Sequence, residues 1–216
     1  MKFKAVIFDL DGTLLNTLGD LRNAVNYALS CFGLPARTTD EVRMFIGNGV
    51  RNLIVRAMPE GASEDDIAKA LGYFREYYNS HLNVETCPYE GIIDMLTSLR
   101  GSGVKVCINS NKYDAALKEL CAHHFNGLYI QAEGESATCP RKPDPSAALM
   151  LAGKCGIEPD EMAYIGDSNV DIRTACNAGM TPIYVSWGFR TREDMGDELP
   201  ELCFDSAKEL TEYILG

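Results

Sequence analysis

The stretch AVIFDLDGTLLN, residues 5–16, places four apolar residues directly before two carboxylates. The apolar run 5–8 predicts a buried strand, and Asp9, Asp11 and Gly12 follow it as a polar turn. Taken alone, the pair also fits a plain turn, because Asp-Gly is a common turn signal. Neighbouring carboxylates repel each other and lose hydration on burial, so such a pair usually needs a cation or a proton.

Short apolar runs recur along the chain and alternate with helical patterns. Runs similar to 5–8 occur at residues 104–108, 127–130, 162–165 and 182–185. Helical patterns occupy residues 91–100, 114–121, 144–156 and 206–215. This alternation predicts an α/β fold, a Rossmann-like doubly wound parallel sheet with helices on both faces.

Residues 17–83 interrupt the alternation, since they contain helical patterns and no convincing strand. One apolar stripe runs through Leu18, Leu21, Val25, Leu29 and Phe32, and another through Ile67, Leu71, Phe74 and Tyr78. Thr38 and Glu41 have the spacing of a capping box. We therefore expect a helical domain at 17–83, inserted into a core formed by 1–16 and 84–216.

Polar residues follow several predicted strands where those strands end. Ligands of a doubly wound sheet bind beyond the carboxyl ends of its strands. Besides the first pair, the residues expected at this edge are Asn109, Ser110, Asn111, Lys142, Asp167 and Asp171. The sequence thus predicts several carboxylates, a hydroxyl and a lysine at one edge of the sheet.

This set of side chains suits Mg²⁺ and a phosphoryl group, because Mg²⁺ prefers oxygen ligands. Asp9 would attack phosphorus to give an aspartyl-phosphate. Asp11 would protonate the leaving alkoxide and later accept a proton from the attacking water. Ser110 and Lys142 would hold the phosphoryl oxygens in the transition state.

Four segments, DLDGT, INSN, RKPDP and GDSNVD, resemble in this order the motifs of the haloacid dehalogenase superfamily. The helical insertion is similar to the C1 cap of that family, and IGNGVRNLIVRA, PYEG and SWGF resemble segments of phosphoglycolate phosphatases. The resemblance implies the catalytic roles given above for Asp9, Asp11, Ser110 and Lys142. It also implies that Asp9, the backbone carbonyl of Asp11, and Asp167 bind the metal, with Asp171 as a further ligand or as a partner of one.

A carboxylate at position 11 favours phosphate-ester chemistry, since the dehalogenases of this superfamily lack it. Asn16 and Asn109 depart from the usual pattern, and we expect them to influence substrate choice. The predicted substrate-binding residues are Thr13, Asn111, Gly47, Asn48 and Arg51. Helix-start amides at 47–49 can meet an anion, although this segment also fits a bare turn and Arg51 also fits a solvated face.

We therefore expect an Mg²⁺-dependent phosphatase that acts on a small phosphorylated metabolite, with 2-phosphoglycolate as the first candidate. The residue types leave two alternatives open. One is a sugar-phosphate mutase with the same aspartyl-phosphate chemistry, and the other is a non-catalytic protein that binds a phosphate ligand.

The net charge and the cysteine content indicate which partners are disfavoured and which cellular compartment is favoured. A formal charge of −11 over 216 residues disfavours nucleic acid and anionic membranes as partners. The sequence has eight cysteines, no CxxC pair and no secretory signal, which favours reduced thiols in a cytoplasmic protein. The sequence leaves the oligomeric state open.

Overall fold

The computed structural model describes residues 1–137 and 139–216 and divides the chain into two compact units. The core unit comprises Met1–Leu15 and Pro88–Gly216, and the helical unit comprises Asn16–Cys87. The second boundary lies four residues beyond the expected one. The reason is the buried Asp20 carboxylate, which accepts hydrogen bonds from the backbone of residues 84–86 and thereby keeps this segment in the helical unit.

Six strands of the described chain form one parallel sheet in the order β5-β4-β1-β6-β7-β8. The strands are β1 (Ala5–Phe8), β4 (Lys105–Tyr113), β5 (Gln131–Glu135), β6 (Met162–Gly166), β7 (Thr181–Val185) and β8 (Cys203–Phe204). The predicted α/β fold is therefore confirmed. β1 lies between β4 and β6 and is wholly buried, which explains why residues 5–8 are all apolar.

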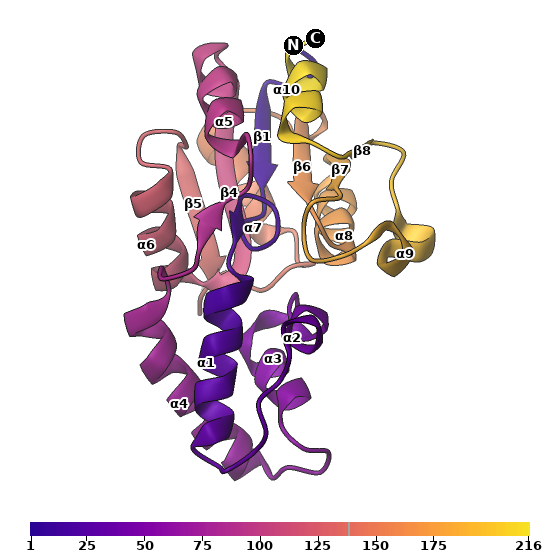
Figure 1. The fold of residues 1–216 in the computed structure, drawn as a ribbon. Helices are drawn as coiled ribbons and strands as arrows, with labels where there is room; N and C mark the ends of the chain where they lie inside the picture. The colour runs from indigo at the N-terminus through magenta and orange to yellow at the C-terminus, as the bar shows by residue number, and fades with distance from the viewer. Residues whose placement is uncertain (138) are drawn as a thin grey trace. The chain divides into compact units, whose positions relative to one another are not determined.

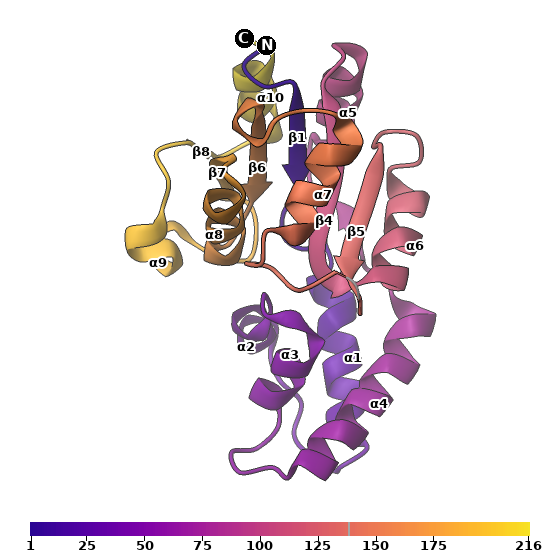
Figure 2. The same cartoon turned by 180° about the vertical axis from the view of Figure 1, so that it is seen from behind.

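Helices cover both faces of this sheet. They are α5 (Ile92–Gly101), α6 (Asp114–His124), α7 (Ser146–Cys155), α8 (Asn169–Ala178), the short α9 (Arg192–Met195) and α10 (Ala207–Leu215), with 3₁₀ turns η1 (Pro159–Glu161) and η2 (Gly196–Glu198). Figure 1 shows α5 and α10 in front of the sheet, and Figure 2 shows α7 and α8 on the opposite face. The strand order runs outward from β1 in both directions, through β4 and β5 on one side and through β6, β7 and β8 on the other.

One strand prediction was wrong. Residues 127–130 contain no strand: 127 and 128 lie in a turn, 130 lies in a bend, and the strand β5 starts directly after them at Gln131. β5 is an edge strand in which buried and half-buried residues alternate, so its polar sequence gave no continuous apolar run. The two-residue strand β8 is too short to have a sequence signature.

The helical unit consists of α1 (Leu18–Ser30), α2 (Thr39–Phe45), α3 (Gly49–Ala57) and α4 (Glu64–His81). Figure 1 shows α1 and α4 side by side, and most of the apolar stripe residues of both helices are buried. The Thr38–Glu41 capping box is confirmed: Glu41 N donates to Thr38 Oγ1, and Thr38 N donates to Glu41 Oε2.

Three further features complete the description of the fold. β2 (Leu15–Asn16) and β3 (Cys87–Pro88) form a small two-stranded sheet at the junctions between the units. All eight cysteines lie in the described residues and are free. Among the described helices, none is long and apolar enough to cross a membrane.

Candidate active site

Asp9 lies at the carboxyl end of the central strand, and its backbone is held by a hydrogen bond from Asp9 N to Ile165 O (2.9 Å). Its Oδ1 accepts hydrogen bonds from Leu10 N (2.7 Å) and lies 2.9 Å from Lys142 Nζ. Within the described residues, Oδ2 accepts no hydrogen bond. One oxygen of the predicted nucleophile is thus fixed, and the other is left for an incoming group.

Lys142 connects two carboxylates of this cluster. Its Nζ lies 2.9 Å from Asp9 Oδ1 and 2.6 Å from Asp171 Oδ1, and the side chain is almost wholly buried. Burial alone would lower the pKa of Lys142, but the Asp171 and Asp9 carboxylates hold it well above its usual value. Lys142 therefore carries a positive charge at the position where the sequence predicted a phosphate-holding lysine.

Asn111 fixes the backbone of Lys142. Its Oδ1 accepts a hydrogen bond from Lys142 N (2.7 Å), and its Nδ2 donates to Lys142 O (3.3 Å). The side-chain amide thereby joins the end of β4 to the segment before α7. These contacts give Asn111 a structural role, and its predicted contact with substrate stays a prediction.

Asp167, directly after β6, is held by the loop that follows β7. Its Oδ2 accepts a hydrogen bond from Phe189 N (2.6 Å), and Thr13 Oγ1 lies 3.5 Å from Oδ1. The packing is close enough to require glycine: a Cβ on Gly188 would lie 2.3 Å from Asp167 Cβ, and one on Gly12 would lie 2.4 Å from Asp167 Oδ2. The segments containing Gly12 and Gly188 therefore enclose this carboxylate.

Asp171 lies in the first turn of α8 and is fully buried. Its Oδ2 accepts hydrogen bonds from Ser168 N (3.1 Å) and Ser168 Oγ (2.6 Å), and its Oδ1 accepts one from Lys142 Nζ. Both oxygens are thus engaged by protein groups. Ser168 stands at the N-cap of α8 and contacts the site through Asp171.

The carboxylates of Asp9, Asp167 and Asp171 form a group able to hold a cation, because one oxygen of each lies within 4.8 Å of the other two. Burial raises the pKa of Asp9 to about 8, against the lowering effect of the Lys142 ammonium. Burial, followed by the Asp171 carboxylate, raises the pKa of Asp167 to about 7. Carboxylates with raised pKa values ionise more readily when a positive charge lies beside them. Because Mg²⁺ prefers oxygen ligands, these carboxylates fit a divalent cation of this kind.

Asp11 forms an ion pair that the sequence did not reveal. Lys112, at the end of β4, places its Nζ 2.9 Å from Asp11 Oδ1 and 3.3 Å from Asp11 Oδ2. Lys112 N also donates to Ser110 Oγ (3.2 Å), so one residue contacts both the predicted acid–base group and the predicted phosphate holder. The sequence does show a lysine within the polar segment NSNK. However, a lysine next to the end of a strand is usually exposed to solvent, so the sequence alone gave no reason to place it in the site.

The remaining predicted residues lie in the helical unit. Gly47 has a φ of 116°, a backbone conformation that favours glycine, and Asn48 precedes the first residue of α3. Arg51 Nη2 lies 2.6 Å from Glu64 Oε2 in an exposed ion pair. Their predicted role in substrate binding stays a prediction.

The two departures from the family pattern have local explanations. Asn109 is buried; its Nδ2 donates to Glu133 O, and its Oδ1 accepts from the Tyr164 hydroxyl. It therefore ties β4 to β5 and β6 within the sheet. Asn16 Oδ1 accepts a hydrogen bond from Leu18 N at the start of α1.

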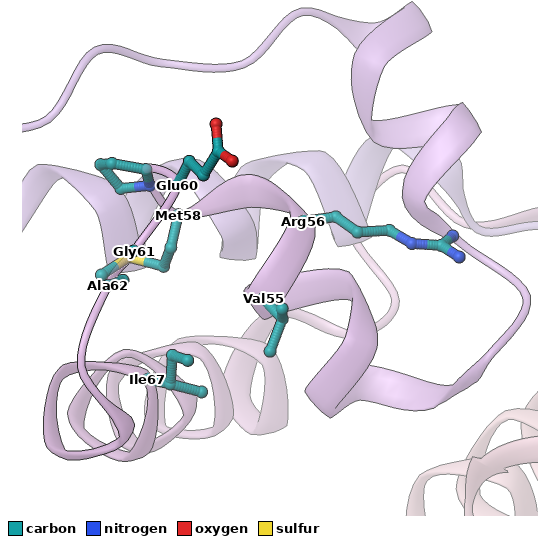
Figure 3. A pocket seen from close by; sticks show the side chains of 8 residues that line it. Val55, Arg56, Met58, Glu60, Gly61, Ala62 and Ile67 are labelled. Atoms are coloured by element: carbon teal, nitrogen blue, oxygen red, sulfur yellow. The ribbon is translucent and has the colours of Figure 1, made fainter.

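A pocket of about 450 Å³ lies in the helical unit between the end of α3 and the start of α4 (Figure 3). Val55, Met58 and Ile67 contribute apolar surface to it, whereas the Arg56 side chain extends toward its hydrogen-bond acceptors, Met44 O and Phe45 O. The residues that line the pocket include none of the predicted site residues.

Known proteins with similar sequences and structures are consistent with this arrangement of the site. The family model described as haloacid dehalogenase-like hydrolase matches residues 6–185. The chain is 34% identical to phosphoglycolate phosphatase 1 of Pseudomonas aeruginosa, over 96% of this chain and 78% of that protein. It is 31% identical to a phosphoglycolate phosphatase of Vibrio parahaemolyticus, over 98% and 96% of the two chains.

A solved structure from Lactobacillus delbrueckii subsp. bulgaricus, described as a candidate phosphoglycolate phosphatase, superposes with a TM-score of 0.95 at 34% identity and covers 100% of both chains. Both the fold and the order of the site residues along the chain thus agree with one family. The chain belongs to the haloacid dehalogenase-like hydrolase family.

Proposed function

We propose that this hydrolase cleaves the phosphate ester of a small metabolite, with Mg²⁺ as cofactor and 2-phosphoglycolate as the first candidate substrate. The observation that carries the proposal is the arrangement around Asp9. One carboxylate oxygen is held by Leu10 N and Lys142, while Asp11 lies two residues away with its own ammonium partner. This arrangement supplies a nucleophile, a phosphate-binding cation and a separate proton donor.

In the first half-reaction, Asp9 Oδ2 attacks phosphorus and the bond between phosphorus and the leaving oxygen breaks. Asp11, which must hold a proton when the substrate is bound, gives it to the leaving alkoxide, and the phosphoryl group stays on Asp9 as a mixed anhydride. In the second half-reaction, Asp11 accepts a proton from water, whose oxygen attacks phosphorus and releases the Asp9 carboxylate. Ser110 and Lys142 would hold the phosphoryl oxygens in both steps.

The bound metal would reduce the repulsion between the phosphate and the acidic cluster. Four carboxylates and two ammonium groups, those of Lys112 and Lys142, leave a formal charge of −2 in the site, which a divalent cation cancels. We assign Asp9, Asp167 and the Asp11 carbonyl as ligands. We assign Asp171 to positioning, because Ser168 and Lys142 already engage both of its oxygens.

The two bacterial relatives reported above favour phosphatase activity over the mutase alternative, since both are named phosphoglycolate phosphatase and are 34% and 31% identical to this chain. We retain the interpretation of the helical unit as a C1 cap, with Gly47, Asn48 and Arg51 as its substrate-binding residues. We also retain a cytoplasmic location.

A panel of phosphorylated metabolites, assayed for phosphate release with Mg²⁺ and with EDTA, tests the proposal. We expect Mg²⁺-dependent phosphate release with 2-phosphoglycolate among the best substrates. Conversion of a sugar phosphate into its isomer, without phosphate release, would instead identify a mutase. Absence of turnover on every ester would refute both enzymatic functions.

A further inference from the structure

The Lys112–Asp11 ion pair is unusual because both side chains are largely withdrawn from water. The side chain of Lys112 is 4% exposed and that of Asp11 is 15% exposed. Burying an ammonium group is costly unless it is paired and well positioned. Both residues belong to the core unit, so their placement beside Asp9 does not depend on the helical unit.

The two buried lysines of the site serve different carboxylates. Lys142 contacts Asp9 and Asp171, on the side of the nucleophile. Lys112 contacts Asp11, on the side where the leaving group receives its proton. A positive charge is not needed on that side to bind the phosphoryl group, since Lys142 already serves the phosphorus-bound oxygens. Lys112 therefore places a second positive charge beside Asp11, on the side of the leaving group.

The chemistry of one substrate class makes such a charge necessary. In the phosphate ester of a 2-hydroxy acid, the carboxylate is attached to the carbon that bears the leaving oxygen. When Asp11 protonates that oxygen, the substrate carboxylate must lie within a few ångströms of the Asp11 carboxyl group. Once Asp11 has given up its proton, the two carboxylates repel unless a cation lies beside both, and a cation at hydrogen-bond distance from Asp11 meets that need.

We propose that Lys112 is a specificity-determining residue that selects phosphate esters carrying a carboxylate next to the leaving oxygen, as 2-phosphoglycolate does. This inference rests on the proposed phosphatase function. The Lys112 ammonium interacts with Asp11 and with the substrate carboxylate together. The backbone N–H of Lys112 donates a hydrogen bond to Ser110 Oγ, the hydroxyl proposed to hold the phosphoryl group. This bond fixes the position of Lys112 relative to the phosphate-binding hydroxyl.

The test compares 2-phosphoglycolate with 2-hydroxyethyl phosphate, which has the same two-carbon leaving group with a hydroxymethyl in place of the carboxylate. We expect the wild-type protein to prefer 2-phosphoglycolate in kcat/KM. Lys112→Met, which keeps an unbranched side chain one atom shorter but removes the charge, should reduce this preference by about 100-fold, because a charged group of the substrate loses its partner. Lys112→Arg, which keeps the charge, should retain most of the preference.

Lys118→Met is the matched control, since Lys118 is exposed on α6 and pairs with Asp114 away from these contacts. We expect it to leave kcat/KM unchanged for both substrates. If Lys112→Met lowers kcat/KM equally for both substrates, the inference is overturned. Lys112 would then only position Asp11 and would not select the substrate.

The wild-type protein provides a test that does not depend on the folding of any variant. Equal kcat/KM for the two substrates would overturn the role of Lys112 and leave the phosphatase function standing. Failure to hydrolyse any phosphate ester would refute the phosphatase function itself.

Discussion

At the scale of single residues, the site separates a nucleophile from a proton donor that lies two positions further along the chain. Asp9 is buried at the end of β1, whereas Asp11 is partly exposed and paired with Lys112. The same residue type can thus have two chemical roles because its surroundings differ.

The role of Asp11 predicts a dependence on the leaving group. In Asp11→Asn, we expect kcat/KM for an alkyl phosphate to fall by about 10²–10⁴-fold, because the leaving alkoxide no longer receives a proton. An ester with a good leaving group, p-nitrophenyl phosphate, should still show a rapid first turnover, measured as a burst of p-nitrophenol.

Asp94→Asn makes the same change at an exposed position of α5 and should leave both substrates unaffected. If the variant at position 11 loses the burst and steady turnover of both substrates equally, Asp11 is not the proton donor to the leaving group.

At the scale of elements, the loop after β7 determines the position of Asp167. Trp187 Nε1 donates to Thr13 O (2.9 Å), and Phe189 N donates to Asp167 Oδ2, so this loop joins the turns that follow β1 and β6. Gly188 lies between these two anchors, where a side chain does not fit.

Gly188→Ala should therefore weaken metal binding. The added methyl group must displace the loop or Asp167, which we expect to cost about 1–3 kcal/mol of stability and to raise the Mg²⁺ concentration needed for half-maximal activity. Thermal melting and Mg²⁺ titration of activity measure the two effects.

Gly153→Ala is the control, since Gly153 lies in α7 with open space around it. It should raise stability by about 0.5–1 kcal/mol and leave the Mg²⁺ titration unchanged. An unaltered Mg²⁺ titration in Gly188→Ala would show that the loop does not position Asp167 for the metal.

Individual strands show which parts of the fold and of the site can be predicted from the sequence alone. β1 was predictable because it is buried on both faces, while β5 was displaced in the prediction because an edge strand needs no continuous apolar run. The motif carboxylates were predictable because strand order brings them to one edge of the sheet. The Lys112–Asp11 pair was not, because it joins positions 101 residues apart whose contact depends on the path of β4 beyond Ser110.

At the scale of the whole molecule, the acidic site opposes the stability of the metal-free protein at neutral pH. The pKa values of Asp9 and Asp167 are raised to about 8 and about 7 from an ordinary value of 3.8. Between about pH 4 and pH 8, the folded protein therefore binds more protons than the unfolded chain at these two groups. Their contribution to stability is full below the ordinary pKa and is lost as the pH rises through the raised values.

We therefore expect the stability gained from Mg²⁺ to be larger at pH 8 than at pH 5, because the cation favours the ionised carboxylates. Melting temperatures with Mg²⁺ and with EDTA across this range measure the difference. Burial lowers the pKa of His124, which acts in the opposite direction, so Asp9→Asn is the necessary comparison. Between pH 5 and pH 8 in EDTA, that variant should lose less stability than the wild type; an identical pH dependence would contradict the assignment.

The central claim is that phosphate is transferred through Asp9, and acid quenching during turnover tests it most directly. The protein is mixed with 2-phosphoglycolate and Mg²⁺, quenched in acid, digested and mapped by mass spectrometry. In parallel, Asp11→Asn is mixed with p-nitrophenyl phosphate, whose good leaving group needs no proton in the first half-reaction, so that only the second half-reaction is slowed. We predict a phosphoryl group on the peptide that contains Asp9, and none in Asp9→Asn. Steady phosphate release without any phosphorylated Asp9, or full turnover by Asp9→Asn, would contradict the account.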